Sequence, residues 1–495
     1  MAFTTQSFIF FFFPFCMAAY YIVAALQKKG RISALLSKLR AADLCIIGIG
    51  CCFYLWACFD DLIRLLIYVC AVYFAGMLIE KSREKIYIVS TNGSPEEKRL
   101  SAAKPILIAA LGLIIFVLVQ FKYTGMAASV WNFLFKDNVQ GKSVLAPLGI
   151  SFISFSAISY LVDIYRGAAP RGGLIDCALY LTFFPKVVSG PIVLWRDFMP
   201  QIGNRGVDTA IISDGIDRIM VGFAKKLILA DTFGACISSA AQAIDVQTAF
   251  GMSLLYMLQI YFDFSGYSDI AIGLSNMLGF SMKENFNFPY LSCSIGEFWR
   301  RWHISLGTWF REYIYFPMGG SREGKTRTML NIGVVFALTG IWHGAGWAYM
   351  LWGMLNGVFN VLERSMEEYA LYRKTPKFMK WFATMMITFF CWQLFRFGSI
   401  SDALNWFKIM FGIVEFDTIP YNYRQYFDTR MVVLMSIAMI GATVWGLPKV
   451  QAVYKKVTQH PVGYVIHELV VLLLFVVAIM FMVNSKYSPF IYFQY

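Results

Sequence analysis

Two histidines, His303 and His343, lie in an unusual stretch of the sequence between residues 298 and 364. The chain has only four histidines, and these two are surrounded by almost continuously apolar and aromatic residues. An imidazole exchanges a proton near neutral pH, and placing it in apolar surroundings is costly unless it has partners there. We therefore expect the chemical centre at these two residues. A hydrogen-bonded structural histidine is the alternative for each.

The sequence around His343 predicts a helical hairpin. The flanking segments 321–327 and 364–380 are expected on the cytoplasmic side because of their charge. As a helix, residues 329–342 would extend about 21 Å, which is less than the ~30 Å hydrocarbon core of a bilayer. We therefore expect His343 deep in the membrane, at the turn between two helices.

Residues 298–316, which contain His303, are predicted to form one amphipathic helix. One face would be aromatic, and Arg300 and Arg311, close to three turns apart, would share another face. These guanidinium groups could contact lipid phosphates or hold the phosphates of a cytoplasmic acyl donor. The candidate residues for binding donor or substrate are Arg300, Arg301, Arg311, Asp263, Asp269, Trp302, Trp342 and Asn356.

Asp263 and Asp269 lie in an apolar segment, 247–280. Carboxylates in such sequence are expected to face the interior of a helix bundle and to pair with a cation or with polar substrate atoms. A structural ion pair with one of the three arginines above is the alternative. The sequence leaves both interpretations open.

The composition is typical of an all-α polytopic membrane protein. Hydrophobic residues make up 58% of the chain, charged residues 15%, and the mean hydropathy is +0.58. The net charge of +13 comes from loops between apolar runs, which indicates membrane orientation rather than nucleic-acid binding. We expect roughly eleven transmembrane helices, with re-entrant and amphipathic helices around a central tunnel. The cysteines show no metal-ligand spacing, so no metal site is expected.

Charge also predicts the topology. The first apolar run lacks the features of a cleaved signal peptide, so we expect a retained helix. The basic loops 28–40 and 81–104 are expected in the cytoplasm, and both termini outside it, with a last span at 462–484. The four ordinary spans expected before residue 125 are 6–26, 43–58, 62–80 and 104–120.

The character of the sequence changes after Leu145. Ser151 and Ser154, and likewise Ser156 and Ser159, lie three residues apart, which favours close helix packing. Prolines and a glycine interrupt the apolar segment 181–202, which also contains Lys186. Irregular backbone at membrane depth needs surrounding protein or a water-filled cavity, so we expect a re-entrant or broken segment here.

Several long motifs follow one another between residues 145 and 364. They are PLGISFISFSAISYLVDIYRG, FFPKVVSGPIVLWRDFMPQ, YFDFSGYSDIAIGLSNMLGF followed by ENFNFPY, FWRRWHISLGTWFREYIYFPMGG and GIWHGAGWAYMLWGMLNG. In these motifs and their order the sequence resembles the membrane-bound O-acyltransferase (MBOAT) family. Within it, the resemblance is to the branch that includes the alginate O-acetyltransferase membrane subunit and the D-alanyl transferase of teichoic acid modification.

The resemblance implies roles for both histidines. His343 matches the catalytic base in a membrane-embedded tunnel, and His303 matches a second site residue on the cytoplasmic side. Transfer of an acyl group from a thioester to a hydroxyl needs a base for the hydroxyl proton, which suits a neutral imidazole. An acyl-histidine intermediate is the less economical alternative. The donor would be acetyl-CoA or an acyl-carrier-protein thioester, with no bound cofactor.

The last ten residues, KYSPFIYFQY, form an aromatic tail that is expected outside the cytoplasm. The tail resembles the aromatic C-terminal motif of this branch, although Tyr495 stands where phenylalanine is common. In the teichoic acid system a tyrosine of a small partner protein carries the acyl group, so Tyr492 is a candidate acyl relay. An interfacial aromatic anchor is the alternative.

These features predict peripheral helices in residues 1–125, a catalytic core in 126–364, and C-terminal helices with the tail in 365–495. The expected function is a membrane O-acyltransferase of the bacterial cytoplasmic membrane that passes acetyl outward to an exported or cell-surface polysaccharide. An extracytoplasmic acetyl-transferring partner protein would complete the reaction. The alternatives are a D-alanyl transferase, a proton-coupled transporter and a structural subunit of a polysaccharide export complex. The RRWH and WHGAGW motifs and the absence of detectable inverted repeats favour the enzyme.

Overall fold

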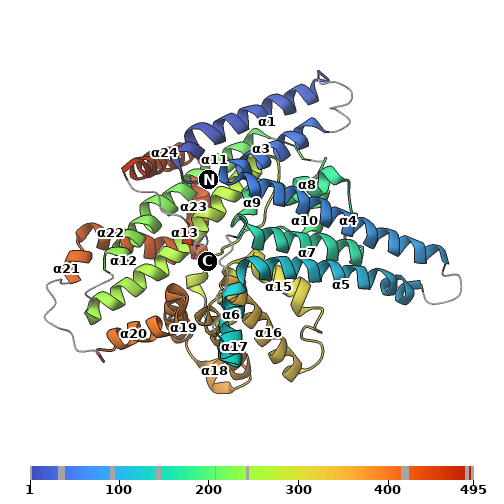
Figure 1. The fold of residues 1–495 in the computed structure, drawn as a ribbon. Coiled ribbons are helices and arrows are strands. Elements are labelled where there is room, and N and C mark those ends of the chain that lie inside the picture. Colours follow the sequence, from blue (N-terminus) through green and yellow to red (C-terminus); the bar gives the residue numbers. More distant parts are fainter. Residues whose placement is uncertain are drawn as a thin grey trace. The chain divides into compact units, whose positions relative to one another are not determined.

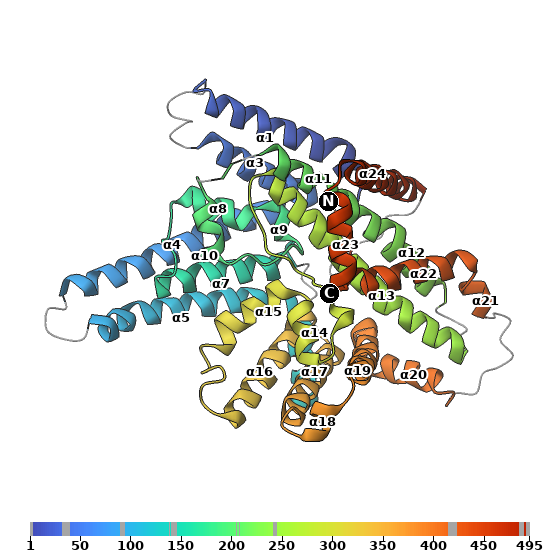
Figure 2. The same cartoon turned by 180° about the vertical axis from the view of Figure 1, so that it is seen from behind.

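The computed structural model describes residues 3–31, 40–89, 95–137, 139, 146–203, 205–206, 208–240, 245–413, 423–484 and 490–491. Every regular element in these ranges is a helix (Figures 1 and 2), so the all-α prediction is confirmed. The chain forms two compact units. The first contains Met1–Ile216 and Ala271–Lys283, and the second contains Asp217–Ile270 and Glu284–Tyr495. The expected division at residues 125 and 364 stays a prediction.

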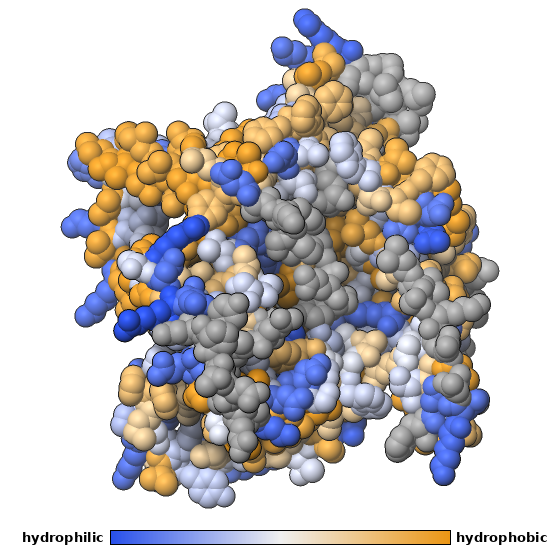
Figure 3. Space-filling view, turned by 60° about the vertical axis from the view of Figure 1, so that its left-hand side comes forward, coloured by the Kyte–Doolittle hydropathy of each residue, from blue (hydrophilic) through white to orange (hydrophobic). Residues whose placement is uncertain are grey.

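Six helices in the described part of the chain are long and apolar enough to cross a membrane. Many large apolar side chains on them are exposed, and Figure 3 shows such residues over wide areas of one face. Apolar surface of this extent is suited to lipid. The expected total of roughly eleven spans stays a prediction. The six candidates are Phe8–Lys28, Phe59–Arg83, Ala103–Lys122, Lys377–Phe397, Thr429–Gly446 and Pro461–Asn484, with Ala41–Ala57 as a shorter apolar helix.

The first unit contains the four expected N-terminal apolar helices. α4, α5 and α7 pack side by side, and α1 packs against α3 (Figure 1). The elements are η1 (Phe8–Phe12), α1 (Phe13–Lys28), α3 (Ala41–Ala57), α4 (Phe59–Val89), α5 (Pro95–Lys122), α6 (Thr124–Phe135), α7 (Ile150–Arg166), α8 (Leu174–Thr182), α9 (Phe184–Val187), α10 (Trp195–Phe198), η2 (Met199–Gln201), the start of α11 (Thr209–Phe223) and the end of α13 (Val246–Met277, from Ala271 in this unit).

The segment 181–202 is broken into short helical pieces with extended backbone between them, as expected. Polar side chains of α7 bind it. The Lys186 ammonium donates to Ser156 Oγ at 2.8 Å, and the Trp195 N–H donates to Ser159 Oγ at 2.8 Å. The Arg196 N–H donates to an Asp163 carboxylate oxygen at 3.1 Å. The α7 serines therefore form hydrogen bonds with buried polar groups of the broken segment 181–202. The sequence predicts only that they allow close packing of helices.

The second unit contains the histidines and is built around α13, α17 and α19. Its buried core includes aromatic residues from each of these helices and from the short α14. The elements are the end of α11, η3 (Ala224–Ala230), α12 (Asp231–Ser239), α13 (Val246–Met277, to Ile270 in this unit), η4 (Pro289–Leu291), α14 (Ile295–Arg301), α15 (Ile304–Phe310), η5 (Arg311–Tyr315), α16 (Lys325–His343), α17 (Trp347–Met366), α18 (Ala370–Lys374), α19 (Lys377–Phe397), α20 (Ile400–Met410), α21 (Tyr423–Tyr426), α22 (Thr429–Ala442), η6 (Val444–Gly446), α23 (Pro448–Thr458) and α24 (Pro461–Asn484).

The prediction of one helix over 298–316 is wrong. The chain breaks at Trp302 and His303, and His303 has a left-handed backbone with φ of 47°. A segment distant in sequence stabilises the break, because the Ile304 N–H donates to the Asn285 carbonyl at 2.9 Å. Arg300 and Arg311 therefore lie on different short helices and do not share one helical face.

Candidate active site

His343 lies at the turn of a helical hairpin, as predicted. α16 ends at this residue and α17 begins at Trp347, and the two helices pack along each other (Figure 2). Glycines allow this approach: a Cβ on Gly340 would lie 2.5 Å from the Tyr349 carbonyl oxygen. A Cβ on Gly353 would lie 2.4 Å from the Phe336 carbonyl oxygen. The hairpin thus requires small residues where α16 and α17 touch.

Aromatic rings surround the His343 imidazole. Its ring centroid lies 4.7 Å from that of Trp342, 5.2 Å from that of Trp352 and 5.1 Å from that of Phe395. The Trp352 and Phe395 rings meet the imidazole edge-on, and His343 is 4% exposed. The site therefore offers a proton-exchanging group in apolar and water-poor surroundings.

His303 is held by Asn285. The Asn285 side-chain oxygen lies 3.1 Å from His303 Nδ1 and accepts the Ser305 N–H at 3.2 Å and the Ser305 hydroxyl at 2.8 Å. Since a backbone N–H can only donate, the atom facing it is an oxygen, and His303 Nδ1 must carry its hydrogen. The lone pair of His303 is therefore on Nε2, which is the ring nitrogen that can accept a proton.

Both histidines contact Trp342, so the fold brings the two predicted residues together. The His303 ring centroid lies 6.2 Å from that of Trp342 and 4.6 Å from that of Phe264. His303 lies between two short helices, outside the six candidate spans, and is 1% exposed. Burial lowers its pKa to about 3. His303 is therefore neutral near pH 7.

The helix before His303 is fixed at both ends. At the start of α14 the Glu363 carboxylate accepts the Ile295 N–H at 2.6 Å. Glu363 also accepts the Tyr372 hydroxyl at 2.8 Å. A carboxylate at a helix N-terminus satisfies unpaired N–H groups and favours the helix dipole. Near the other end, the Trp299 indole N–H donates to Asn356 at 3.2 Å. Asn356 thus links α14 to α17, which is a structural role for this predicted binding residue.

The predicted arginines have different surroundings. Arg301 is bound by the Glu297 carboxylate at 2.8 Å and by the Asn287 carbonyl at 3.1 Å. Arg300 and Arg311 are exposed. Trp302 is 1% exposed and packs against Trp392 with ring centroids 4.9 Å apart. Arg300 and Arg311 therefore remain accessible to a phosphate group, whereas Trp302 is part of the core.

Both predicted aspartates form ion pairs, but not with the arginines named above. The Asp263 carboxylate lies 2.6 Å from Lys226 Nζ, which also lies 2.7 Å from Asp231. The pairing requires close approach of α11 and α13, since a Cβ on Gly222 would lie 2.7 Å from the Gly266 carbonyl oxygen. The expected pairing with Arg300, Arg301 or Arg311 is not what the structure shows, and a role of the two aspartates in binding substrate stays a prediction. The partners of Asp269 are Lys225 Nζ at 2.6 Å and Arg218 at 3.0 Å.

The second oxygen of Asp263 binds the tail. The Ile491 N–H donates to it at 2.8 Å. The Phe490 ring packs edge-on against Tyr267, with centroids 4.5 Å apart, and lies 4.6 Å from Lys226 Nζ. Phe490 is 1% exposed and Ile491 6% exposed. The chain therefore enters the core immediately before Tyr492, which itself lies outside the described residues.

An apolar cavity of about 810 Å³ lies in the same unit, between α13, α19 and α22. Its lining includes Phe250, Leu254, Trp381, Met385 and Met435. Neither histidine lines it. The central tunnel expected around His343 stays a prediction.

Three residues that the sequence did not single out support this site: Asn285, Lys226 and Glu363. Each is a polar residue in or beside a predicted motif, and each has a partner at least 18 residues away in the sequence. The only local signal was an ionisable or amide side chain within apolar sequence.

The comparisons with known proteins agree with these features. Residues 165–401 match the model of the membrane-bound O-acyltransferase family. The chain is 33% identical to the probable alginate O-acetylase AlgI of Pseudomonas putida, over the full length of both proteins. It is 32% identical to the peptidoglycan O-acetyltransferase of Helicobacter pylori, over 62% of this chain and 64% of that protein. It is 31% identical to the teichoic acid D-alanyltransferase of Bacillus subtilis, over 60% of this chain and 75% of that protein.

The full-length match, the family match over both histidines and the apolar helices support one conclusion. The chain belongs to the membrane-bound O-acyltransferase family and is an O-acyltransferase that is integral to the membrane.

Proposed function

We propose that this enzyme transfers an acetyl group from a cytoplasmic thioester through Tyr492 to an exported or cell-surface polysaccharide. The observation that carries the proposal is the burial of Phe490 and Ile491 against Asp263 and Lys226, in the unit that also contains both histidines. Two buried side chains and a hydrogen bond to a charged carboxylate are more than a surface anchor requires. They support the entry of the following tyrosine into the site.

The proposed step uses His343 as the base. As the Tyr492 oxygen attacks the thioester carbonyl, His343 takes the hydroxyl proton, a C–O bond forms and the C–S bond breaks. The proton then passes to the thiolate that leaves. The product is a tyrosyl ester, whose acyl group a hydroxyl of an extracytoplasmic partner protein takes up in a second transfer. The neutral His303 would act on the cytoplasmic side of the same site, next to Trp342.

The donor is proposed to be acetyl-CoA or an acyl-carrier-protein thioester. Both carry phosphate groups, and the exposed guanidinium groups of Arg300 and Arg311 match phosphate oxygens in geometry and charge. The aromatic rings of Trp342, Trp352 and Phe395 around His343 suit a small acyl group and exclude water.

The acetyl group and the polymer class are proposed from the relatives. The AlgI protein of Pseudomonas putida aligns over its full length, whereas the teichoic acid D-alanyltransferase aligns over 60% of this chain. Family membership also favours an enzyme over the transporter and structural-subunit alternatives. We place the protein in the bacterial cytoplasmic membrane with both termini outside the cytoplasm, on the basis of its loop charges.

The test is the transfer of radiolabelled acetyl from acetyl-CoA to the purified protein in nanodiscs. The wild type is expected to become labelled, and His343→Ala and Tyr492→Phe are expected to lose the label. His460→Ala is the matched control, because His460 is exposed and precedes α24. This variant should be labelled like the wild type.

Two outcomes would contradict the proposal. Full acylation of the polymer in cells that carry Tyr492→Phe would exclude the tyrosine relay. Labelling from a D-alanyl carrier, and none from acetyl-CoA, would instead identify a D-alanyl transferase.

A further inference from the structure

The last helix, α24, carries two ionisable residues in a very apolar sequence. It is the most apolar of the six candidate spans in the described part of the chain. His467 and Glu468 are adjacent, six and seven residues after the helix start at Pro461. At 1.5 Å per residue this is roughly 10 Å from the helix start, and both side chains are partly exposed. Ionisable groups in a span are costly and need a partner or a function.

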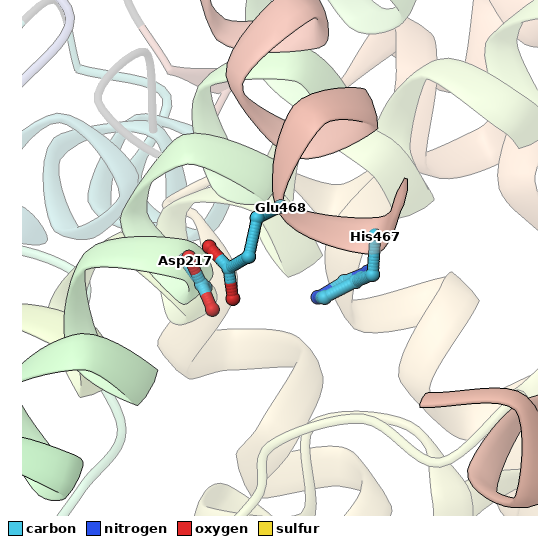
Figure 4. A group of neighbouring side chains, drawn as sticks. All are labelled: Asp217, His467 and Glu468. Carbon is cyan, nitrogen blue, oxygen red and sulfur yellow. The ribbon is translucent and has the colours of Figure 1, made fainter. Parts of the chain in front are cut away.

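A third ionisable side chain faces this pair. Asp217 of α11, His467 and Glu468 each offer a ligand atom, and these atoms lie within 4.8 Å of one another. Figure 4 shows the two carboxylates side by side and the imidazole directed toward them. α24 packs against η3, which continues α11, so the three residues connect two neighbouring helices.

Two basic residues that follow Asp217 in the chain, Arg218 and Lys225, bind other carboxylates. Arg218, the neighbour of Asp217, binds Asp269 and Glu284. Lys225 binds Asp269. Glu468 Oε1 is buried and has no hydrogen-bond partner among the described residues. Two adjacent carboxylates repel each other, so a cation between them would stabilise both.

The imidazole is oriented by a neighbour on α23. The Tyr454 hydroxyl lies 3.2 Å from His467 Nδ1, and the two rings meet edge-on with centroids 5.7 Å apart. A histidine that binds a metal usually engages its other ring nitrogen in such a hydrogen bond, which fixes the ring orientation. If Nδ1 donates to the tyrosine oxygen, Nε2 keeps its lone pair for a metal.

We propose that Asp217, His467 and Glu468 bind a divalent transition-metal ion that connects α24 to α11. One imidazole and two carboxylates suit Zn²⁺ or Mn²⁺, whereas Ca²⁺ and Mg²⁺ prefer oxygen ligands alone. Water would complete the coordination. The site is separate from the histidines of the acyl transfer, and the inference does not depend on the proposed relay.

The test uses the full-length protein in detergent, purified without a histidine tag and stripped with a chelator. Zn²⁺ or Mn²⁺ alone is then titrated, and bound metal is measured by mass spectrometry together with the unfolding temperature. The wild type should bind one ion per chain and unfold at a higher temperature when loaded. His467→Gln and Asp217→Asn should each bind at least tenfold more weakly.

His460→Gln is the matched control, since this exposed histidine lies seven residues before His467, outside the cluster. It should bind metal like the wild type. Unfolding temperatures of the stripped variants close to that of the stripped wild type would show that folding is intact. If a variant does not fold, Glu468→Gln replaces it. Equal binding by the His467 and His460 variants, or well under one ion per wild-type chain, would overturn the proposal.

Discussion

Replacing Gly340 by alanine tests whether the close approach of α16 and α17 positions His343. The new Cβ would lie 2.5 Å from the Tyr349 carbonyl oxygen and 3.2 Å from the Gly353 Cα. Both are backbone atoms, so no side-chain rotation relieves the contact. The helices must separate by roughly 1 Å, and such overpacking typically costs about 1–3 kcal/mol.

The effect on activity should exceed the effect on stability. His343 follows Gly340 by less than one helical turn, so the separation moves the base directly. A misplacement of about 1 Å at a catalytic group lowers rates on the order of 100-fold. We therefore expect Gly340→Ala to fold in the membrane and to retain about 1% of the acyl transfer.

Gly333→Ala provides the control on the same helix. Apart from the backbone of its own helix, no heavy atom in the described part of the chain lies within 4 Å of a Cβ at this position. Alanine is about 1 kcal/mol better than glycine within a helix, so this variant should be as stable as the wild type or more stable, with unchanged activity. Both variants are assayed for acyl transfer and thermal unfolding. Wild-type activity in Gly340→Ala would refute the view that this contact positions His343.

Three further predictions concern the tail, His303 and Glu363. Phe490→Ala should lose about 3–5 kcal/mol of packing energy in the tail and lower acyl transfer at least tenfold. Transfer is measured on protein that unfolds at the wild-type temperature, and unchanged transfer would contradict the role of the tail. The pKa of about 3 for folded His303 is below its unfolded value, so the wild type should lose up to ~1.4 kcal/mol of stability per pH unit as the pH falls from about 6.5 toward 3. His303→Gln should lose less over this window in unfolding experiments, and an equal loss would be evidence against a buried neutral histidine. Glu363→Gln removes the charge at the start of α14 and should lower stability by about 1 kcal/mol, whereas the same change at the exposed Glu367 should have little effect.

Sequence alone was enough to predict features that depend on local pattern. Apolar run lengths predicted the helical membrane class and the four N-terminal helices, because a span must satisfy its backbone within one segment. The hairpin at His343 followed from two short apolar segments between charged flanks. The prolines and glycine of 181–202 predicted its broken backbone.

Only the tertiary structure decided which polar groups meet. Asn285 lies 18 residues from His303, Lys226 lies 37 from Asp263, and Asp263 lies 228 from Ile491. Helical periodicity predicts neighbours three or four residues apart and has no information about such pairs. For the same reason 298–316 was predicted as one helix: its break depends on the Asn285 backbone and side chain, which satisfy the N–H groups at the start of α15. Local sequence pattern therefore determined which helix ends carry the histidines. Long-range hydrogen bonds and ion pairs determined the surroundings of the histidines, because a buried polar group must be hydrogen-bonded and its partner can come from any part of the chain.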